Sequence, residues 1–124
     1  MKLVALSLLL ATLAGCGSFA GGALQGRDVG GDMQDSRELD LLFQELETEE
    51  TKLKTLLAAF SSENRAVDCP RACDLRASIT NLARRICSVT ERMANRDRQV
   101  QCVDARRRSE IAKADVKNVC ECGK

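Results

Sequence analysis

The amino-acid sequence predicts an all-α fold, in which an acidic first helix packs on a disulfide-stapled antiparallel helical hairpin. Three observations lead to this prediction. The chain has no glycine between residues 35 and 122, which favours long helices over turns. Apolar residues in this region recur at alternating spacings of three and four, as in small helical bundles and coiled coils. Six cysteines follow residue 68, enough to cross-link two neighbouring helices if the chain is exported.

The first helix is expected over about residues 36–62. Asp35 is placed to cap its start, and Glu38 is the matching partner of a capping box. An apolar seam follows, interrupted only by Glu49, and further apolar residues beside it allow the helix to pack against two partners. The seam consists of Leu39, Leu42, Leu46, Leu53, Leu56 and Phe60.

The second helix is expected over about residues 70–94. Pro70, the only proline, is tolerated in a first helical turn, and Asp68 can accept a capping hydrogen bond there. Its apolar positions keep the same spacing without a break: Ala72, Leu75, Ile79, Leu82, Ile86, Val89 and Met93.

A polar cluster at residues 95–99 predicts the turn of the hairpin, and Asp97 is the expected cap of a third helix over about residues 98–119. The seam of this helix is small and weak: Cys102, Ala105, Ser109, Ala112, Val116 and Val119. An alternative stays open, because neither glycine nor proline interrupts residues 71–119. In that alternative this segment is one long helix, and the disulfides are intermolecular.

The composition excludes several classes of function. The 124 residues allow at most one small domain. The chain has no histidine, which removes the commonest general base and the commonest nitrogen ligand of zinc. It has no tryptophan or tyrosine and a net charge of +1, so that a platform for stacking bases or holding nucleic acid is not expected. We therefore expect no enzyme, no cofactor and no bound metal.

Charge is divided along the chain. Residues 26–50 hold nine acidic and two basic side chains, whereas residues 67–124 hold eight acidic and thirteen basic ones. The first interpretation is that the acidic first helix lies against the basic hairpin. The second is that two arginine clusters, Arg84-Arg85 and Arg106-Arg107-Arg108, face anionic lipid head groups or another polyanion of the cell envelope.

The six cysteines are expected to form three nested disulfides. In an antiparallel helix pair, partners lie at similar distances from the turn, and this predicts the pairs Cys69–Cys122, Cys73–Cys120 and Cys87–Cys102. The same cysteines allow a rival interpretation, in which four of them, Cys69, Cys73, Cys120 and Cys122, form a metal or thiol-sensing site. Two helices joined by nested cystines also resemble the architecture of an α-hairpinin, although only the first CxxxC of that family is present.

The first residues have the pattern of an export signal. Lys2 precedes a short apolar stretch over residues 3–13, which is too short to span a membrane, and Leu13-Ala14-Gly15-Cys16 follows directly. This sequence resembles the signal peptide of bacterial lipoproteins, whose lipobox has Leu, a small residue, Gly or Ala, and then Cys. The resemblance implies export, cleavage before Cys16 and acylation of that cysteine. Gly17 in place of aspartate favours the outer membrane, facing the periplasm, if the host is diderm.

The expected organisation is a signal peptide at residues 1–15, a glycine-rich flexible tether at residues 16–34 and a disulfide-rich helical domain at residues 35–124. The expected function is that of a non-enzymatic envelope lipoprotein, held to the bilayer by acylated Cys16 and presenting a rigid helical module for structural or protein-interaction purposes. Neither a nucleic acid nor a small-molecule substrate is expected. A further alternative is a peptidoglycan-linked structural lipoprotein, joined through the terminal Lys124.

Overall fold

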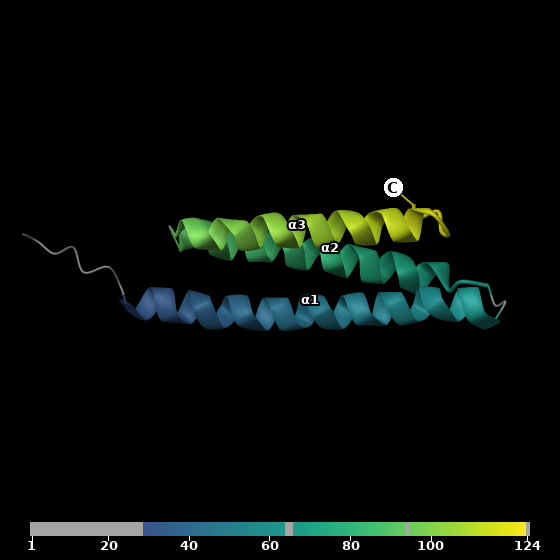
Figure 1. Cartoon of the computed structure of the whole chain (residues 1–124), viewed down its shortest axis with the longest axis horizontal. Helices are drawn as coiled ribbons and strands as arrows, with labels where there is room; N and C mark the ends of the chain where they lie inside the picture. Colours follow the sequence, from purple (N-terminus) through teal and green to yellow (C-terminus); the bar gives the residue numbers. More distant parts are fainter. Residues whose placement is uncertain (1–28, 64–65, 94, 124) are drawn as a thin grey trace, which may run out of the picture.

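The computed structural model describes residues 29–63, 66–93 and 95–123, and the chain forms three α-helices within them. Helix α1 spans Val29–Glu63, α2 spans Cys69–Arg92 and α3 spans Arg96–Lys117. They lie side by side in an elongated bundle (Figure 1), in which α2 runs antiparallel to both neighbours and α1 and α3 run the same way. The expected all-α fold with a helical hairpin is confirmed, and the break between Arg92 and Arg96 rules out one helix over residues 71–119.

The predicted signal peptide, Cys16 and Lys124 lie outside the described residues. The end of the predicted tether does not, and that part of the prediction is wrong: residues 29–34 belong to α1. The helix begins before Asp35, and Asp32 lies in its first turn, where a negative charge interacts favourably with the helix dipole. Asp35 is therefore not a cap, and its carboxylate contacts Arg92 of α2 instead.

The capping of the hairpin helices follows from short polar side chains. Asp68 accepts a hydrogen bond from the backbone N–H of Arg71 at 3.1 Å, as expected for the cap of α2. At the start of α3 the cap is Asn95, whose side chain accepts from the N–H of Asp97 at 2.9 Å. The expected cap, Asp97, is thus inside the helix, because α3 begins two residues earlier than predicted.

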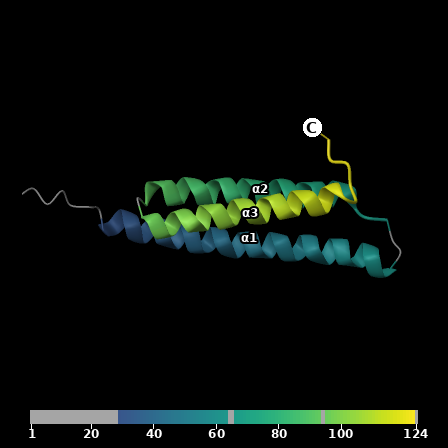
Figure 2. The same ribbon diagram turned by 45° about the horizontal axis from the view of Figure 1, so that its top comes forward.

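Helix α2 is the central element of the packing, since it contacts α1 on one side and α3 on the other. Both views show the hairpin of α2 and α3 lying along α1 (Figures 1 and 2). A single core runs through the described residues, and α2 supplies more of it than either neighbour. The buried apolar side chains are Leu39, Leu42, Leu46 and Leu53 of α1, Ala72, Leu75, Ile79, Leu82, Ala83, Ile86, Cys87 and Val89 of α2, Ala105, Ala112 and Val116 of α3, and Cys120 after α3.

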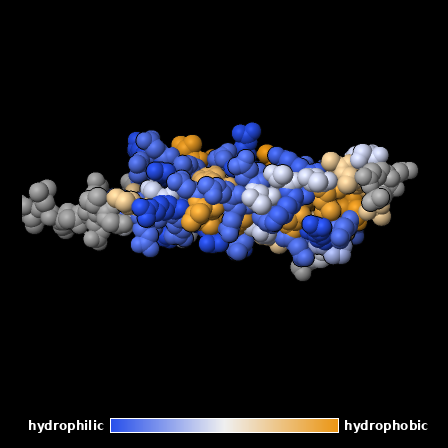
Figure 3. Space-filling model, turned by 90° about the horizontal axis from the view of Figure 1, so that it is seen from below, coloured by the Kyte–Doolittle hydropathy of each residue, from blue (hydrophilic) through white to orange (hydrophobic). Residues whose placement is uncertain are grey.

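The seam predicted for α1 weakens toward its end. Leu56 is half-buried and Phe60 is 41% exposed, although both follow the heptad spacing. In a view from the α1 side, hydrophilic residues dominate, and an apolar area appears at the end where α1 finishes and α2 begins (Figure 3). The partly buried side chains of Leu57 and Val67 also pack at the margin of the core.

Small side chains let α3 approach α2 closely. Ala105, Ser109 and Ala112 are all buried, and the hydroxyl of Ser109 lies 3.1 Å from that of Thr80 across the interface. Thr80 in turn donates to the backbone carbonyl of Arg76 at 2.9 Å. In the described residues, no buried side-chain nitrogen or oxygen lacks a hydrogen-bond partner, so this interface carries no cost from unpaired polar groups.

The position of Leu46 gives a direct test of the α1–α2 packing. Leu46 is fully buried, whereas Leu41 on the same helix is 63% exposed. We expect Leu46→Ala to lower the free energy of unfolding by about 2–5 kcal/mol, because it removes buried methyl groups and leaves a cavity. Denaturant unfolding followed by far-UV circular dichroism measures the change. Leu41→Ala is the matched control, and equal losses in the two variants would contradict the packing described.

Candidate functional site

The disulfide framework joins α2 to α3 and to the residues that follow α3. The bridges are Cys69–Cys120, Cys73–Cys122 and Cys87–Cys102, with Cα–Cα distances of 5.4, 5.6 and 4.5 Å. The predicted pair Cys87–Cys102 is present. The predicted pairs Cys69–Cys122 and Cys73–Cys120 are wrong, because the two partners at the open end of the hairpin are exchanged.

The exchange has a physical cause at the end of α3. The equal-distance argument holds only while both arms of the hairpin follow a helical path. It does hold for Cys69–Cys120 and Cys87–Cys102, whose residue numbers share a midpoint between 94 and 95. Helix α3 ends at Lys117, and Cys120 still donates its N–H to the carbonyl of Val116 at 2.8 Å. Beyond Cys120 the chain is no longer helical, and Cys122 reaches back to Cys73, one turn further along α2.

All six cysteines that follow residue 68 are therefore engaged in disulfides. Within the described ranges, no group of three or more histidine, cysteine, aspartate or glutamate side chains is arranged to hold a metal ion. The four cysteines of the rival interpretation do lie together at one end of the hairpin, but as two cystines. The framework thus fixes the separation of α2 and α3 and offers no thiol for chemistry.

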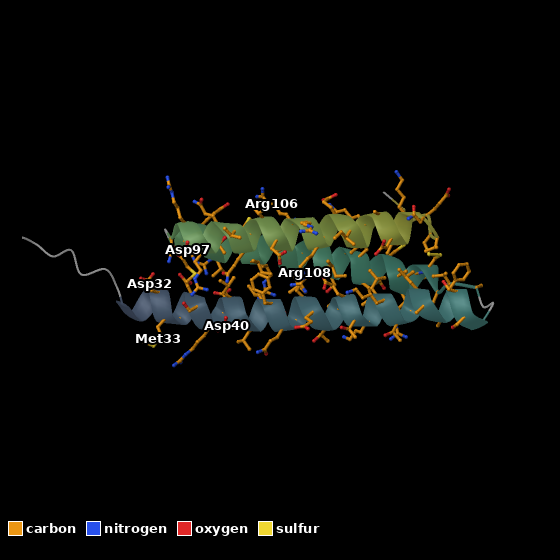
Figure 4. All side chains as sticks on the ribbon, viewed as in Figure 1. Asp32, Met33, Asp40, Asp97, Arg106 and Arg108 are labelled. Atoms are coloured by element: carbon orange, nitrogen blue, oxygen red, sulfur yellow. A yellow bond between two sulfur atoms is a disulfide. The ribbon has the colours of Figure 1, made fainter. Side chains whose placement is uncertain are left out.

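Helix α1 packs mainly on α2. Arg108 provides a side-chain contact from α3 to α1. Its guanidinium donates two hydrogen bonds to the carboxylate of Glu50, from Nε at 2.8 Å and from a terminal nitrogen at 2.7 Å. The same group lies 5.9 Å from the centre of the Phe43 ring, a cation–π distance. Figure 4 shows Arg108 pointing from α3 toward α1. The hydrogen bonds to Glu50 raise the pKa of Arg108 above its ordinary value, against the opposing effect of partial burial.

A second arginine holds the beginning of α1. Arg92, in the last turn of α2, lies 3.0 Å from Asp35 and 3.0 Å from Glu38, and these two acids raise its pKa, with the hydrogen bond to Asp35 as the largest cause. A third, longer pair joins Arg85 to Glu45 at 3.8 Å, with both side chains exposed. The interpretation that the acidic first helix lies against a basic hairpin is therefore confirmed for these contacts.

The sequence clusters of arginine divide between two roles. Arg85 and Arg108 contact acids of α1, and their neighbours Arg84, Arg106 and Arg107 are exposed. In Figure 4, Arg106 points away from α1, on the opposite side of α3 from Arg108. Helical periodicity separates Arg106 from Arg108, since residues two positions apart face nearly opposite directions. Sequence reasoning treated each cluster as one unit and missed this division, which the seam residues Ala105, Ser109 and Ala112 would have indicated.

The surface has shallow grooves between helices. One of about 620 Å³ lies between α1 and α2 and includes Leu41 and Arg85, and another of about 620 Å³ lies between α1 and α3 and includes Phe43, Val100 and Arg108. Both are open to solvent and lined by a mixture of charged and apolar side chains. Such grooves can meet a partner surface.

These features define a small disulfide-linked helical bundle. Comparison with family models, with curated proteins and with solved structures found no match to this chain. None of the helices in the described ranges is both long and apolar enough to cross a membrane.

The exchanged pairing can be read directly from peptides. Trypsin separates Cys69 from Cys73 after Arg71, and cleavage after Glu121 separates Cys120 from Cys122. Digestion without reductant should give residues 66–71 linked to residues 118–121, and residues 72–76 linked to residues 122–124. Mass spectrometry identifies both products. Residues 66–71 linked to residues 122–124 would instead establish the nested pairing and contradict the structure.

The Arg108–Glu50 pair should stabilise the fold more than an exposed pair. In a double-mutant cycle of Arg108→Ala and Glu50→Ala, we expect a coupling free energy of about 1 kcal/mol, because both side chains are mostly shielded and the contact is bidentate. The matched cycle of Arg85→Ala and Glu45→Ala should give less than ~0.5 kcal/mol, since that pair is exposed. Denaturant midpoints measure both. Arg108→Lys keeps the charge but loses the two-pronged geometry, and should retain only part of the coupling.

Proposed function

We propose that this protein is a membrane-anchored lipoprotein of a bacterial cell envelope, non-enzymatic, whose helical bundle is a rigid module for protein interaction. The observation that carries the proposal is Leu13-Ala14-Gly15-Cys16 directly after the apolar stretch of residues 3–13. Two acyl chains or more on a protein give stable membrane attachment. The bundle would then be held near the bilayer on the exported side.

The disulfides support an exported location. Three cystines in so small a bundle are typical of an oxidising compartment, since cytosolic thiols are kept reduced. They also stabilise a bundle whose core lacks tryptophan and tyrosine, since the chain contains neither. A cross-link that closes a loop of about 15 residues is worth roughly 3 kcal/mol in the chain-entropy model. Such a module would keep its shape without a partner.

A role in interaction is favoured over catalysis by how the bundle uses its charged groups. Arg92 and Arg108, whose pKa values are raised, both bind carboxylates of α1. These charged groups therefore join the helices of the bundle.

Two alternative functions make different predictions. A thiol or metal sensor needs free cysteines, so that a thiol count on protein purified without reductant separates it from the structural role. A peptidoglycan-linked form would use Lys124, which lies outside the described residues, and muramidase would release it from cell walls. Complete solubility in detergent would end the peptidoglycan alternative.

Acylation of Cys16 is the test of the proposed function. Full-length protein expressed in a bacterium fed an alkyne-bearing palmitate should incorporate the label, and its mass should show loss of residues 1–15 together with the added lipid. Cys16→Ser should abolish labelling, whereas Ser18→Ala, a nearby control, should not. A chain that is cleaved but never labelled would indicate an ordinary secretory signal and contradict the anchor.

A further inference from the structure

Helix α3 has a face that neither α1 nor α2 covers. Six residues on this face recur at alternating spacings of three and four, and all six are exposed. We name them the outer seam: Asp97, Val100, Asp104, Arg107, Ile111 and Ala114. The buried residues of α3, from Ala105 to Val116, lie on the opposite side of the helix, because each residue turns it by about 100°.

The outer seam has the pattern of a coiled-coil contact. Alternation of three and four keeps a line of side chains facing a partner helix along its length. Val100 and Ile111 within the seam are 68% and 50% exposed, and Val103 beside it is 66% exposed. Covering these aliphatic side chains with another helix removes apolar surface from water and is favourable. The seam therefore has the spacing and the apolar groups needed to pack against one more helix.

The charged residues of the seam indicate that this helix belongs to a second copy of the chain. When two α3 helices pack antiparallel, facing residues lie at equal distances on either side of a common midpoint. With the midpoint between residues 105 and 106, every seam residue faces a seam residue of the other copy. The facing pairs are Val100 with Ile111, Asp104 with Arg107 and Asp97 with Ala114. Two-fold symmetry repeats each pair, so that two Asp–Arg ion pairs lie at the middle of the interface and an aliphatic contact flanks them on each side.

A midpoint at Arg107 itself would destroy this match, although apolar residues would still meet. Arg107 would then face Arg107 of the other copy, and Asp104 would face Glu110. Like charges brought together in an interface oppose association, whereas opposite charges fix its register. The order of charges along the seam therefore selects the midpoint between residues 105 and 106.

The ends of α3 add little to this balance, because they carry both signs. Arg96 of one copy comes near Lys117 of the other, but Asp97 and Asp115 lie within one or two positions of them. These charges are at the rim of the contact, where water and salt screen them. The two central pairs therefore decide the electrostatics of the interface.

The groove between α1 and α3 offers a place for the incoming arginine. It has a volume of about 620 Å³, and its lining includes the carboxylates of Asp40 and Asp104. Arg108 also lines this groove, but its short hydrogen bonds, of 2.7 and 2.8 Å, go to Glu50, and it lies 3.9 Å from Asp104. The side chain of Asp104 is 51% exposed, so that it can bind a second guanidinium. An arginine from another copy thus meets two acids in a groove of sufficient size.

On these grounds we propose that the chain forms an antiparallel homodimer through the outer seam, in which Arg107 of each copy enters the α1–α3 groove of the other and binds Asp104. The contact is closed, because the same surface is used by both copies. A helix of about 33 Å from each copy makes a small interface, so that we expect micromolar rather than nanomolar association. The dimer does not depend on the proposed lipid anchor, since its contacts are made by α3 and the neighbouring groove.

Co-purification of two tagged copies tests the dimer in the full-length chain. Differently tagged copies are co-expressed in a bacterium, extracted in detergent without reductant and purified through one tag, and the amount of the second tag is measured. Arg107→Asp in both copies should lower this amount at least about tenfold, because the new acid faces Asp104. Arg107→Asp in one copy with Asp104→Arg in the other should restore it. Both changes combined in each copy should restore it as well, since the two charges then exchange places.

The apolar contact has its own matched controls. Val100→Ser with Ile111→Ser should also lower co-purification at least about tenfold, because four aliphatic side chains leave the interface. Met33→Ser with Leu41→Ser changes two α1 residues of similar exposure, 56% and 63%, and should leave it unchanged. Far-UV circular dichroism checks that each variant is folded. Arg107→Asp alters an exposed residue and keeps the test valid if Asp104→Arg, which adds a second cation beside Arg108, loses helix.

Three results would overturn the proposal. The first is the absence of the second tag when both copies are wild type. The second is co-purification that Arg107→Asp leaves unchanged or increases, since an increase would place the midpoint at Arg107. The third is a folded charge exchange that does not restore the loss. None of these results bears on acylation of Cys16, so that the dimer and the lipoprotein function can fail separately.

Discussion

The close approach of α2 and α3, fixed by three disulfides, is the constraint on which the rest of the structure depends. At Cys87–Cys102 the two Cα atoms are 4.5 Å apart, and three of the four buried residues of α3 are Ala105, Ser109 and Ala112. Such small groups bury little apolar area, and on transfer free energy alone they would hold a helix weakly. The disulfides stabilise this interface of small side chains, because they restrict the conformations of the unfolded chain.

Helix α1 is held to this cross-linked hairpin by apolar packing and by ion pairs. Four leucines, Leu39, Leu42, Leu46 and Leu53, bury the apolar side of α1 against α2. Arg92 binds acids near its start, and Arg108 binds Glu50 in its middle. The arginine contacts matter for orientation, since they join α1 to both helices of the hairpin. The division of charge along the chain thus becomes a set of contacts between helices, and leaves Arg106 and Arg107 for the outer surface.

The exposed surface of the bundle differs from helix to helix. Val100, Val103 and Ile111 of α3 are exposed apolar side chains, whereas the side of α1 seen in Figure 3 is mostly hydrophilic.

Local chemistry in the sequence determined the helices and the turn. The cap at Asp68, the polar cluster at residues 95–99 and the heptad leucines of α1 act within a few residues of themselves, so that the pattern predicts them. The sequence pattern places the start of α1 too late, because Asp35 has the pattern of a cap. Only the position of Arg92 shows that Asp35 makes a contact between helices.

The disulfide pairing, too, could be predicted from the sequence only in part. Spacing around the polar turn predicts the pair Cys87–Cys102, although the sequence alone also allowed one long helix with intermolecular disulfides. The partners of Cys69 and Cys73 depend on where α3 ends and on how the chain folds back after Cys120, which no local pattern specifies. The sequence by itself determined the helical class, the polar turn at residues 95–99 and the need for covalent support. Only the tertiary structure decided which cysteines pair and which arginines face inward, because both depend on distances between residues that are far apart in the chain.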